Sequence, residues 1–228
     1  MAYYRKILEH VKTFEGGYSA DPVDNASRDS SPVVGLDKRY PTYPVHTYRG
    51  VTWRTWKEYA RRKPFLATGK NFVEMTLAQW EDLLKTLYWD AVLGDKIQSQ
   101  GIAENLFEAV WGGGLKRLVI DLQTFLIARG YKIEADGAFG PKTLAAVNSY
   151  AANQTAERTL IDYLAAKRLE YLQGLDDWWK YRAGWSRRVK EMRDRAISYI
   201  GETLNENPEL PIAAIGLAIG AYLLVKNA

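Results

Sequence analysis

The sequence predicts a mainly α-helical protein with one long irregular loop near its N-terminus and a hydrophobic helix at its C-terminus. Apolar residues recur at spacings of three and four along most of the chain, which indicates amphipathic helices, and no alternating strand pattern of any length competes with them. Residues 19–50 contain four prolines among many serines and aspartates, a composition typical of loops. Residues 210–225 carry no charged side chain.

The expected helices follow from periodicity and from their end signals. A first helix is expected over residues 3–15, ending at Gly16 and Gly17. Thr52 is placed to cap a short helix, and Thr76 with Gln79 forms a capping-box pattern before another. Further helical patterns cover residues 101–111, 115–129, 141–151, 154–173 and 186–204.

The C-terminal run, LPIAAIGLAIGAYLLV over residues 210–225, has two interpretations. Sixteen helical residues rise about 24 Å at about 1.5 Å each, short of a hydrocarbon core of roughly 30 Å but sufficient for a thin or locally deformed bilayer. Gly216 and Gly220 form a small-xxx-small spacing through which two such helices could associate. We expect a transmembrane helix; the alternative is a buried terminal helix of a soluble protein.

Composition excludes several kinds of site. The chain has no cysteine, which rules out disulfides, thiolate zinc sites and a cysteine nucleophile. His10 and His46 belong to no ligand-spaced cluster, so we expect no metal and no cofactor. The formal charge of +4 is small and basic residues alternate with acidic ones along the expected helices, so we expect no nucleic-acid partner. The N-terminus contains no apolar run of signal-peptide length.

The stretch TFEGGY, residues 13–18, places a carboxyl group at the expected end of the first helix. The negative end of the helix dipole disfavours ionisation of Glu15, and burial beside Phe14 would act in the same direction. Such a group is suited to general-acid catalysis, and the two glycines leave room for a bulky substrate. Taken alone, the stretch is nevertheless more typical of an ordinary helix end.

The segment that follows supplies groups that glycoside cleavage needs. An acid protonates the leaving oxygen, and a second group usually orients water or stabilises positive charge. Asp21 and Asp24 lie in the polar loop, and Thr47-Tyr48-Arg49-Gly50-Val51-Thr52 closes it with a glycine beside hydroxyl groups. One glutamate at a helix end, opposite a loop carboxylate, suits this reaction.

The order of several sequence blocks resembles the glycoside hydrolase 108 peptidoglycan muramidases with their peptidoglycan-binding-like half. The blocks lie within about residues 3–195 and read FEGGYSADPVDN, TYRGVT, YWDAV, AVWGGG, LQTFLIARGYKIEADGAFGPKTLAAVN and AGWSRRV. The resemblance implies a lysozyme-like helical fold that cleaves the glycan between N-acetylmuramic acid and N-acetylglucosamine. Glu15 occupies the position of the family's catalytic glutamate.

The resemblance also implies a division of the chain. Residues 1–112 would be the lysozyme-like catalytic half with the long loop 19–50, and residues 113–204 a helical peptidoglycan-binding-like half packed on it. Residues 205–228 would be a linker and the transmembrane helix.

Site residues follow from the same blocks. Glu15 and Asp24 are expected to be catalytic, and the expected substrate-binding residues are Asp21, Thr47, Tyr48, Thr52 and Trp111. The peptidoglycan-binding-like motif comprises Asp136, Gly137, Phe139 and Gly140. An Asp-Gly pair also makes a tight turn and Pro141 suits a helix start, so this motif either contacts the wall or completes the core.

Two features depart from the family pattern. After Asn25 the chain carries about twenty extra residues before the TYRGVT block, which leaves the position of a second carboxylate open. Trp111 stands before the glycines where many members carry asparagine, so sugar contacts there are expected to differ.

Together these features predict a phage- or prophage-type endolysin, anchored at the bacterial inner membrane and acting on periplasmic peptidoglycan. Basic residues between Lys180 and Arg195 precede the apolar run and favour the cytoplasmic side for that flank, so the side of the membrane stays open. One alternative is a non-catalytic peptidoglycan-binding or secretion-associated protein that retains the fold. Another is a membrane-disrupting protein that acts through its C-terminal segment.

Overall fold

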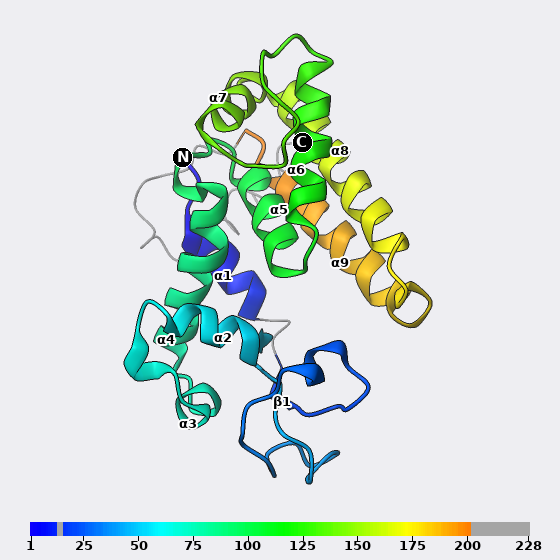
Figure 1. Ribbon diagram of the computed structural model, residues 1–228. Helices are drawn as coiled ribbons and strands as arrows, with labels where there is room; N and C mark the ends of the chain where they lie inside the picture. The colour runs from blue at the N-terminus through cyan, green and yellow to red at the C-terminus, as the bar shows by residue number, and fades with distance from the viewer. Residues whose placement is uncertain (13–15, 202–228) are drawn as a thin grey trace, which may run out of the picture.

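The protein is mainly helical, as predicted. The structure, a computed structural model, describes residues 1–12 and 16–201 (Figure 1). Its α-helices are α1 (Tyr4–Lys12), α2 (Trp53–Ala60), α3 (Gly69–Val73), α4 (Leu77–Leu84), α5 (Gln100–Trp111), α6 (Leu115–Ile127), α7 (Pro141–Tyr150), α8 (Gln154–Gln173) and α9 (Trp178–Ser198). Short turns of helix are η1 (Asn25–Arg28), η2 (Pro64–Leu66), the π-helical η3 (Lys85–Trp89), η4 (Asp90–Val92) and η5 (Gly94–Lys96).

Local capping signals fix several helix starts where the sequence placed them. The Thr52 hydroxyl accepts a hydrogen bond from the amide of Thr55 at the start of α2. Thr76 and Gln79 form the reciprocal capping box of α4. Pro141 occupies the first turn of α7. These ends were predictable because each depends on residues only three positions apart.

The start of the last described helix was predicted wrongly. It was expected at residue 186, but α9 begins at Trp178. Trp178, Tyr181 and Trp185 lie one and two turns apart, and the ring of Trp185 is 6.3 Å from that of Trp178 and 5.4 Å from that of Tyr181. These aromatic contacts extend the helix across Gly184.

The loop 19–50 is less irregular than predicted, because its ends form a small antiparallel sheet. Its strands are β1 (Tyr18–Ser19), β2 (Thr47–Tyr48) and β3 (Val51–Thr52), in the order β1-β2-β3. Ser19 pairs with Thr47, and Thr47 pairs with Thr52 on its other side. Two-residue strands are too short to show an alternating pattern, which explains why the sequence did not reveal them.

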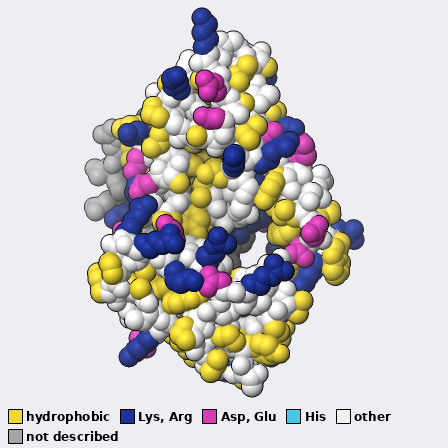
Figure 2. Space-filling model, viewed as in Figure 1, with side chains coloured by type: hydrophobic (Ala, Val, Ile, Leu, Met, Phe, Trp, Pro, Cys, Tyr) yellow, Lys and Arg dark blue, Asp and Glu magenta, His cyan; other side chains and the backbone are white. Residues whose placement is uncertain are grey.

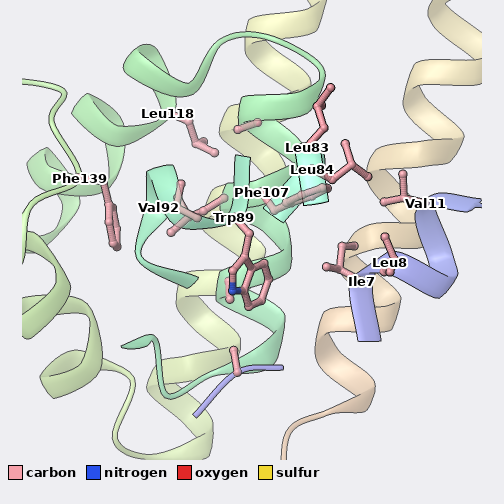
Figure 3. Packing of buried hydrophobic residues seen from close by; sticks show 14 of the residues in the cluster. Ile7, Leu8, Val11, Leu83, Leu84, Trp89, Val92, Phe107, Leu118 and Phe139 are labelled. Carbon is pink, nitrogen blue, oxygen red and sulfur yellow. The ribbon is translucent and has the colours of Figure 1, made fainter. Parts of the chain in front are cut away.

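Helix α5 forms the centre of the core. Every residue from Gln100 to Ala109 is buried, so this helix is enclosed on all sides. Figure 3 shows α1, α4 and α5 contributing side chains to a shared interior, among them Ile7, Leu8, Val11, Leu83, Leu84 and Phe107. The same cluster continues into α6, α7, α8 and α9, with no break between the predicted halves.

A buried carboxylate connects α5 to α9 and, through α9, to α1. Glu104 is fully buried; its Oε2 atom accepts from Arg195 Nε at 2.8 Å, and its Oε1 atom accepts from Gln100 and Tyr199. Arg195 also donates to the backbone oxygen of Lys6 in α1 at 2.5 Å. One guanidinium therefore joins the first, central and last described helices.

The predicted hydrophobic helix at residues 210–225 lies outside the described residues, as do Gly216 and Gly220. Over residues 1–12 and 16–201, no helix is both long and apolar enough to cross a bilayer.

Candidate active site

Glu15 lies outside the described residues; the nearest described residues are Lys12, which ends α1, and Gly16. A hollow of about 350 Å³, here called the hairpin hollow, is lined by Lys12, Gly16, Gly17, Tyr48, Arg49, Leu77 and Trp80. Gly16 and Gly17 have open space where a Cβ would stand. The hairpin hollow is therefore open at Gly16 and Gly17, the two residues that follow Glu15 in the sequence.

Thr47 is oriented by His46, a residue that sequence reasoning did not select. The His46 ring is fully buried, with Nε2 at 3.2 Å from the backbone oxygen of Asp21 and Nδ1 at 2.9 Å from the Thr47 hydroxyl. A carbonyl oxygen only accepts, so Nε2 carries the proton, and in the neutral ring Nδ1 accepts from Thr47. The lone pairs of the Thr47 oxygen are then left to accept a hydrogen bond from water or a sugar hydroxyl.

Tyr48 stacks on Tyr18 of the neighbouring strand, with ring centroids 4.4 Å apart and planes inclined at 19°. The Tyr18 hydroxyl donates to the backbone oxygen of Val73 at 2.9 Å. Burial, followed by the proximity of Tyr48, raises the pKa of Tyr18 and keeps its hydroxyl a donor. The stacked pair fixes the wall of the hairpin hollow.

Thr52 is committed to helix capping, and its hydroxyl is also 3.0 Å from that of Thr55. Thr55 lines a second and larger hollow of about 790 Å³ beside α2, together with Asp29, Arg54, Lys57, Glu58, Arg61, Leu87 and Tyr88. Of the predicted site residues that the structure describes, none lines this α2 hollow. We centre the site on the hairpin hollow because residues 16 and 17 line it.

Asp21 and Asp24 lie together in the turn after β1. The Asp24 amide donates to the Asp21 backbone oxygen at 3.1 Å, and the exposed Asp24 carboxylate accepts from the amide of Ala26, capping η1. The Asp21 carboxylate accepts from the amide of Val23. Both carboxylates order the turn and retain oxygen lone pairs for further contacts.

The face of the molecule drawn in Figure 2 has an opening near its middle, between the lower part of the molecule and the end of α8 and α9. Lys and Arg side chains gather around it. A basic rim attracts anionic polymers from solution.

The inserted loop folds around Asp37, a carboxylate that sequence reasoning missed. Asp37 is 5% exposed and accepts from the amide of Ala20 at 3.0 Å, from the amide of Arg39, and from the Arg39 guanidinium. The Arg39 hydrogen bond is the main reason that the pKa of Asp37 is lowered to about 2. The insertion is thus tied to the end of β1.

Replacing Asp37 with asparagine is expected to reduce the free energy of unfolding by about 1–3 kcal/mol at neutral pH, because buried donors lose a charged acceptor. The folded-state pKa lies below the ordinary value of 3.8, so the carboxylate stabilises the fold above about pH 4, and this contribution is lost as the pH falls toward about 2. Urea unfolding of both proteins at several pH values measures the difference, which should shrink over that window.

Asp29→Asn is the matched control, because Asp29 lies in the same loop and pairs with Lys57 at the surface. It should cost less than about 1 kcal/mol. An equal loss in the two variants, or a difference for Asp37→Asn that persists at pH 2, would contradict this role for Asp37.

Trp111 is not brought to the hairpin hollow. Its ring is parallel to that of Phe107, with centroids 6.5 Å apart, and meets Tyr88 edge-on at 5.1 Å. It lines a separate hollow of about 160 Å³ that also includes Trp185 and Arg168. Arg168 donates to the backbone oxygens of Gly112 and Gly113. A Cβ at Gly112 would overlap the Arg168 side chain, and Gly113 and Gly114 have φ +76° and +91°, which explains the three glycines structurally.

The Asp136–Gly140 motif lies between α6 and α7, at the opposite end of the molecule from the sheet (Figure 1). Its centre is Gln123, a buried side chain of α6 whose Nε2 atom is 2.8 Å from Asp136 Oδ1 and whose Oε1 atom accepts from the Gly137 amide. Gly137 has φ +77°, and a Cβ there would lie 2.7 Å from the Lys116 side chain. Phe139 is buried in the core. These contacts account for the motif as a turn that docks on α6.

No group of three His, Cys, Asp or Glu side chains that could hold a metal occurs within the described ranges 1–12 and 16–201.

The chain matches known families over most of its length. Residues 8–114 match the family described as glycosyl hydrolase 108, and residues 118–190 match a predicted peptidoglycan domain. Residues 8–114 form a glycosyl hydrolase 108 domain. This glycosyl hydrolase 108 protein is therefore a glycoside hydrolase that acts on peptidoglycan.

This glycosyl hydrolase 108 protein also resembles a solved structure over most of its length. Brucella abortus SagA is similar to it at 26% identity and a TM-score of 0.66, over 88% of this chain and 97% of that one. No curated protein is significantly similar to the chain.

Proposed function

We propose that this protein is a muramidase that hydrolyses the glycan of peptidoglycan between N-acetylmuramic acid and N-acetylglucosamine, with Glu15 as general acid. The observation that carries the proposal is the open hollow beside Gly16 and Gly17, directly after Glu15 in a glycosyl hydrolase 108 sequence. A glutamic acid kept in its neutral form can donate its proton to the leaving oxygen.

We propose that the second catalytic group lies in the turn after β1 and that a residue of strand β2 assists it. Asp24, with Asp21 beside it, would assist the attacking water, and Thr47 would position that water through the lone pairs left open by His46. Tyr48 and Thr52 would hold the sugar or the walls that surround it. Trp111 would contact substrate only from its own separate hollow.

We propose that residues 1–112 carry the chemistry and that residues 113–204 form a wall-binding half built on the shared core. The match of residues 118–190 to a predicted peptidoglycan domain supports this division. The Asp136–Gly140 motif would support wall binding by shaping the surface around its turn.

A second candidate is a non-catalytic wall-binding protein that retains the fold. The inserted loop favours it, because Asp37 and Arg39 add an ordered segment beside the turn that carries Asp21 and Asp24. Incubation with insoluble peptidoglycan separates the two candidates. A muramidase releases reducing ends, whereas a binding protein is retained on the wall without releasing them.

The C-terminal run is proposed to anchor the enzyme at the bacterial inner membrane, with Gly216 and Gly220 available for self-association. This proposal rests on the uncharged sequence of residues 210–225. A phage-type lysis enzyme that reaches the wall after the membrane is breached would fit such an anchor.

Deletion of residues 208–228 is expected to leave turnover of purified peptidoglycan within about twofold, because all the proposed catalytic and substrate-binding residues precede residue 112. The same deletion should abolish sedimentation with phospholipid vesicles, because it removes the apolar run. Vesicle sedimentation and reducing-end release, measured on the same samples, check both parts. Loss of reducing-end release in the truncated protein would contradict this expectation.

A further inference from the structure

Arg49 occupies a backbone conformation that its side chain does not favour. It has φ +49° and Gly50 has φ +68°, and the two form the tight turn between β2 and β3. Turns with two left-handed residues favour Asn, Asp or Gly at the first position. A residue held in an unfavourable conformation often serves function rather than stability.

The Arg49 turn is fixed from two directions. The indole Nε1 of Trp80 donates to the Arg49 backbone oxygen at 2.9 Å, which holds the turn against α4. Arg49 Nε donates to the Tyr48 hydroxyl at 3.0 Å, and the guanidinium carbon is 5.3 Å from the centroid of the Tyr48 ring. Because Tyr48 stacks on Tyr18, the guanidinium is oriented before any ligand arrives.

The charge of Arg49 is not neutralised by the surrounding groups that the structure describes. The other cation of the hairpin hollow, Lys12, forms ion pairs with Glu9 and Glu81, both at 3.0 Å. Among residues 1–12 and 16–201 no carboxylate pairs with Arg49. Its Nε is engaged by a neutral hydroxyl, which leaves the two terminal nitrogens, a planar pair of donors suited to a carboxylate.

We infer that Arg49 binds a carboxylate of the peptide stem of peptidoglycan, and so favours glycan whose stems carry free carboxylates. The inference rests on the proposed muramidase function, which places the glycan beside residues 15–17. In intact peptidoglycan the lactyl carboxyl group of N-acetylmuramic acid is held in the amide bond to the stem, so the free carboxylates lie on the stem peptide, and the stem is the part of this substrate that a guanidinium recognises. Arg49 is thus a specificity-determining residue, separate from the acid and the water-positioning groups.

The substitution Arg49→Asn separates recognition from backbone effects. Asparagine suits a left-handed turn before glycine, so the variant should unfold at a higher temperature than the wild type. It removes a charged contact with the substrate, so the KM for intact peptidoglycan should rise about tenfold. The KM for peptidoglycan whose stem carboxylates have been converted to amides should change less than twofold. Arg62→Asn, an equal loss of charge at an exposed position, should change neither KM value.

Each outcome supports or overturns the inference. An unchanged KM for intact peptidoglycan overturns it, and so does an equal rise on both substrates, which would mean contact with groups other than the carboxylates. If the wild type cuts neither substrate, the muramidase proposal fails, and calorimetric titration with a soluble stem peptide tests Arg49 independently. Binding that Arg49→Asn weakens about tenfold then supports carboxylate recognition, and equal binding by wild type and variant overturns it.

Discussion

Replacing Glu15 with glutamine is expected to lower the turnover of purified peptidoglycan about 10²–10⁴-fold. Glutamine keeps the size of the side chain but has no acidic proton to give the leaving oxygen. Release of reducing ends per enzyme molecule measures the effect, and retention on insoluble wall should stay within about twofold because the amide preserves the shape of the site.

The matched control for Glu15 is Glu9→Gln. Glu9 lies on the exposed face of α1, with its side chain 74% exposed and paired with Lys12. It is the same residue type six positions earlier in the sequence, so this variant should retain nearly full turnover. Turnover that persists in Glu15→Gln would remove Glu15 from the role of general acid, and equal losses in the two variants would indicate a nonspecific charge effect.

Replacing Glu104 with alanine is expected to lower the free energy of unfolding by about 3 kcal/mol. Removing one partner of a buried ion pair typically costs about 3–5 kcal/mol, and the lower end applies because the Arg195 side chain is 28% exposed and can regain water. Tyr199 and Gln100 also lose their acceptor. The midpoint of urea unfolding should fall while its slope stays constant.

The comparison for Glu104 is Glu170→Ala on α8. Glu170 pairs with Lys167 at the surface, with its side chain 58% exposed, so its loss should cost less than about 1 kcal/mol. A Glu104 variant no less stable than the Glu170 variant would show that the contact between α5 and α9 contributes little. Helix α5 lies in the region that matches glycosyl hydrolase 108, and α9 overlaps the region that matches the peptidoglycan domain. Comparing the two variants therefore also measures how strongly the stability of one region depends on its contact with the other.

Helices and their caps could be predicted because their signals are local. Thr52, Thr76 and Gln79 act over three residues, and an amphipathic pattern repeats within one helix. The burial of Glu104 could not be predicted. Its partners lie up to 95 positions away, and the sequence alone gave no sign that α5 is enclosed on every side.

The inserted loop was the least predictable segment. Its pairing of Ser19 with Thr47 spans the whole loop, and two-residue strands leave no repeating pattern. Asp37 was hidden for the same reason, because the amide of Ala20 that it accepts from lies 17 positions earlier. Proline and serine content predicted a loop but not the contacts that order it.

Sequence reasoning gathered part of the candidate site. The blocks that suggested Asp21, Asp24, Thr47 and Thr52 do meet around one small sheet. His46 and Gln123 were missed, although each lies near a selected motif and is buried. A buried polar residue usually has a hydrogen-bond partner. The available signal for His46 was its position directly before Thr47. The available signal for Gln123 was its position on α6, on the side that faces the Asp136-Gly137 turn. Arg49 was visible only as the residue before glycine, and its left-handed backbone required the structure.

The most direct test of the account is mass spectrometry of the fragments that the wild-type protein releases from purified peptidoglycan, with Glu15→Gln treated in parallel. The account predicts muropeptides with N-acetylmuramic acid at the reducing end from the wild type, and their near absence with the variant. Fragments ending in N-acetylglucosamine, or the same fragments from both proteins, would contradict it.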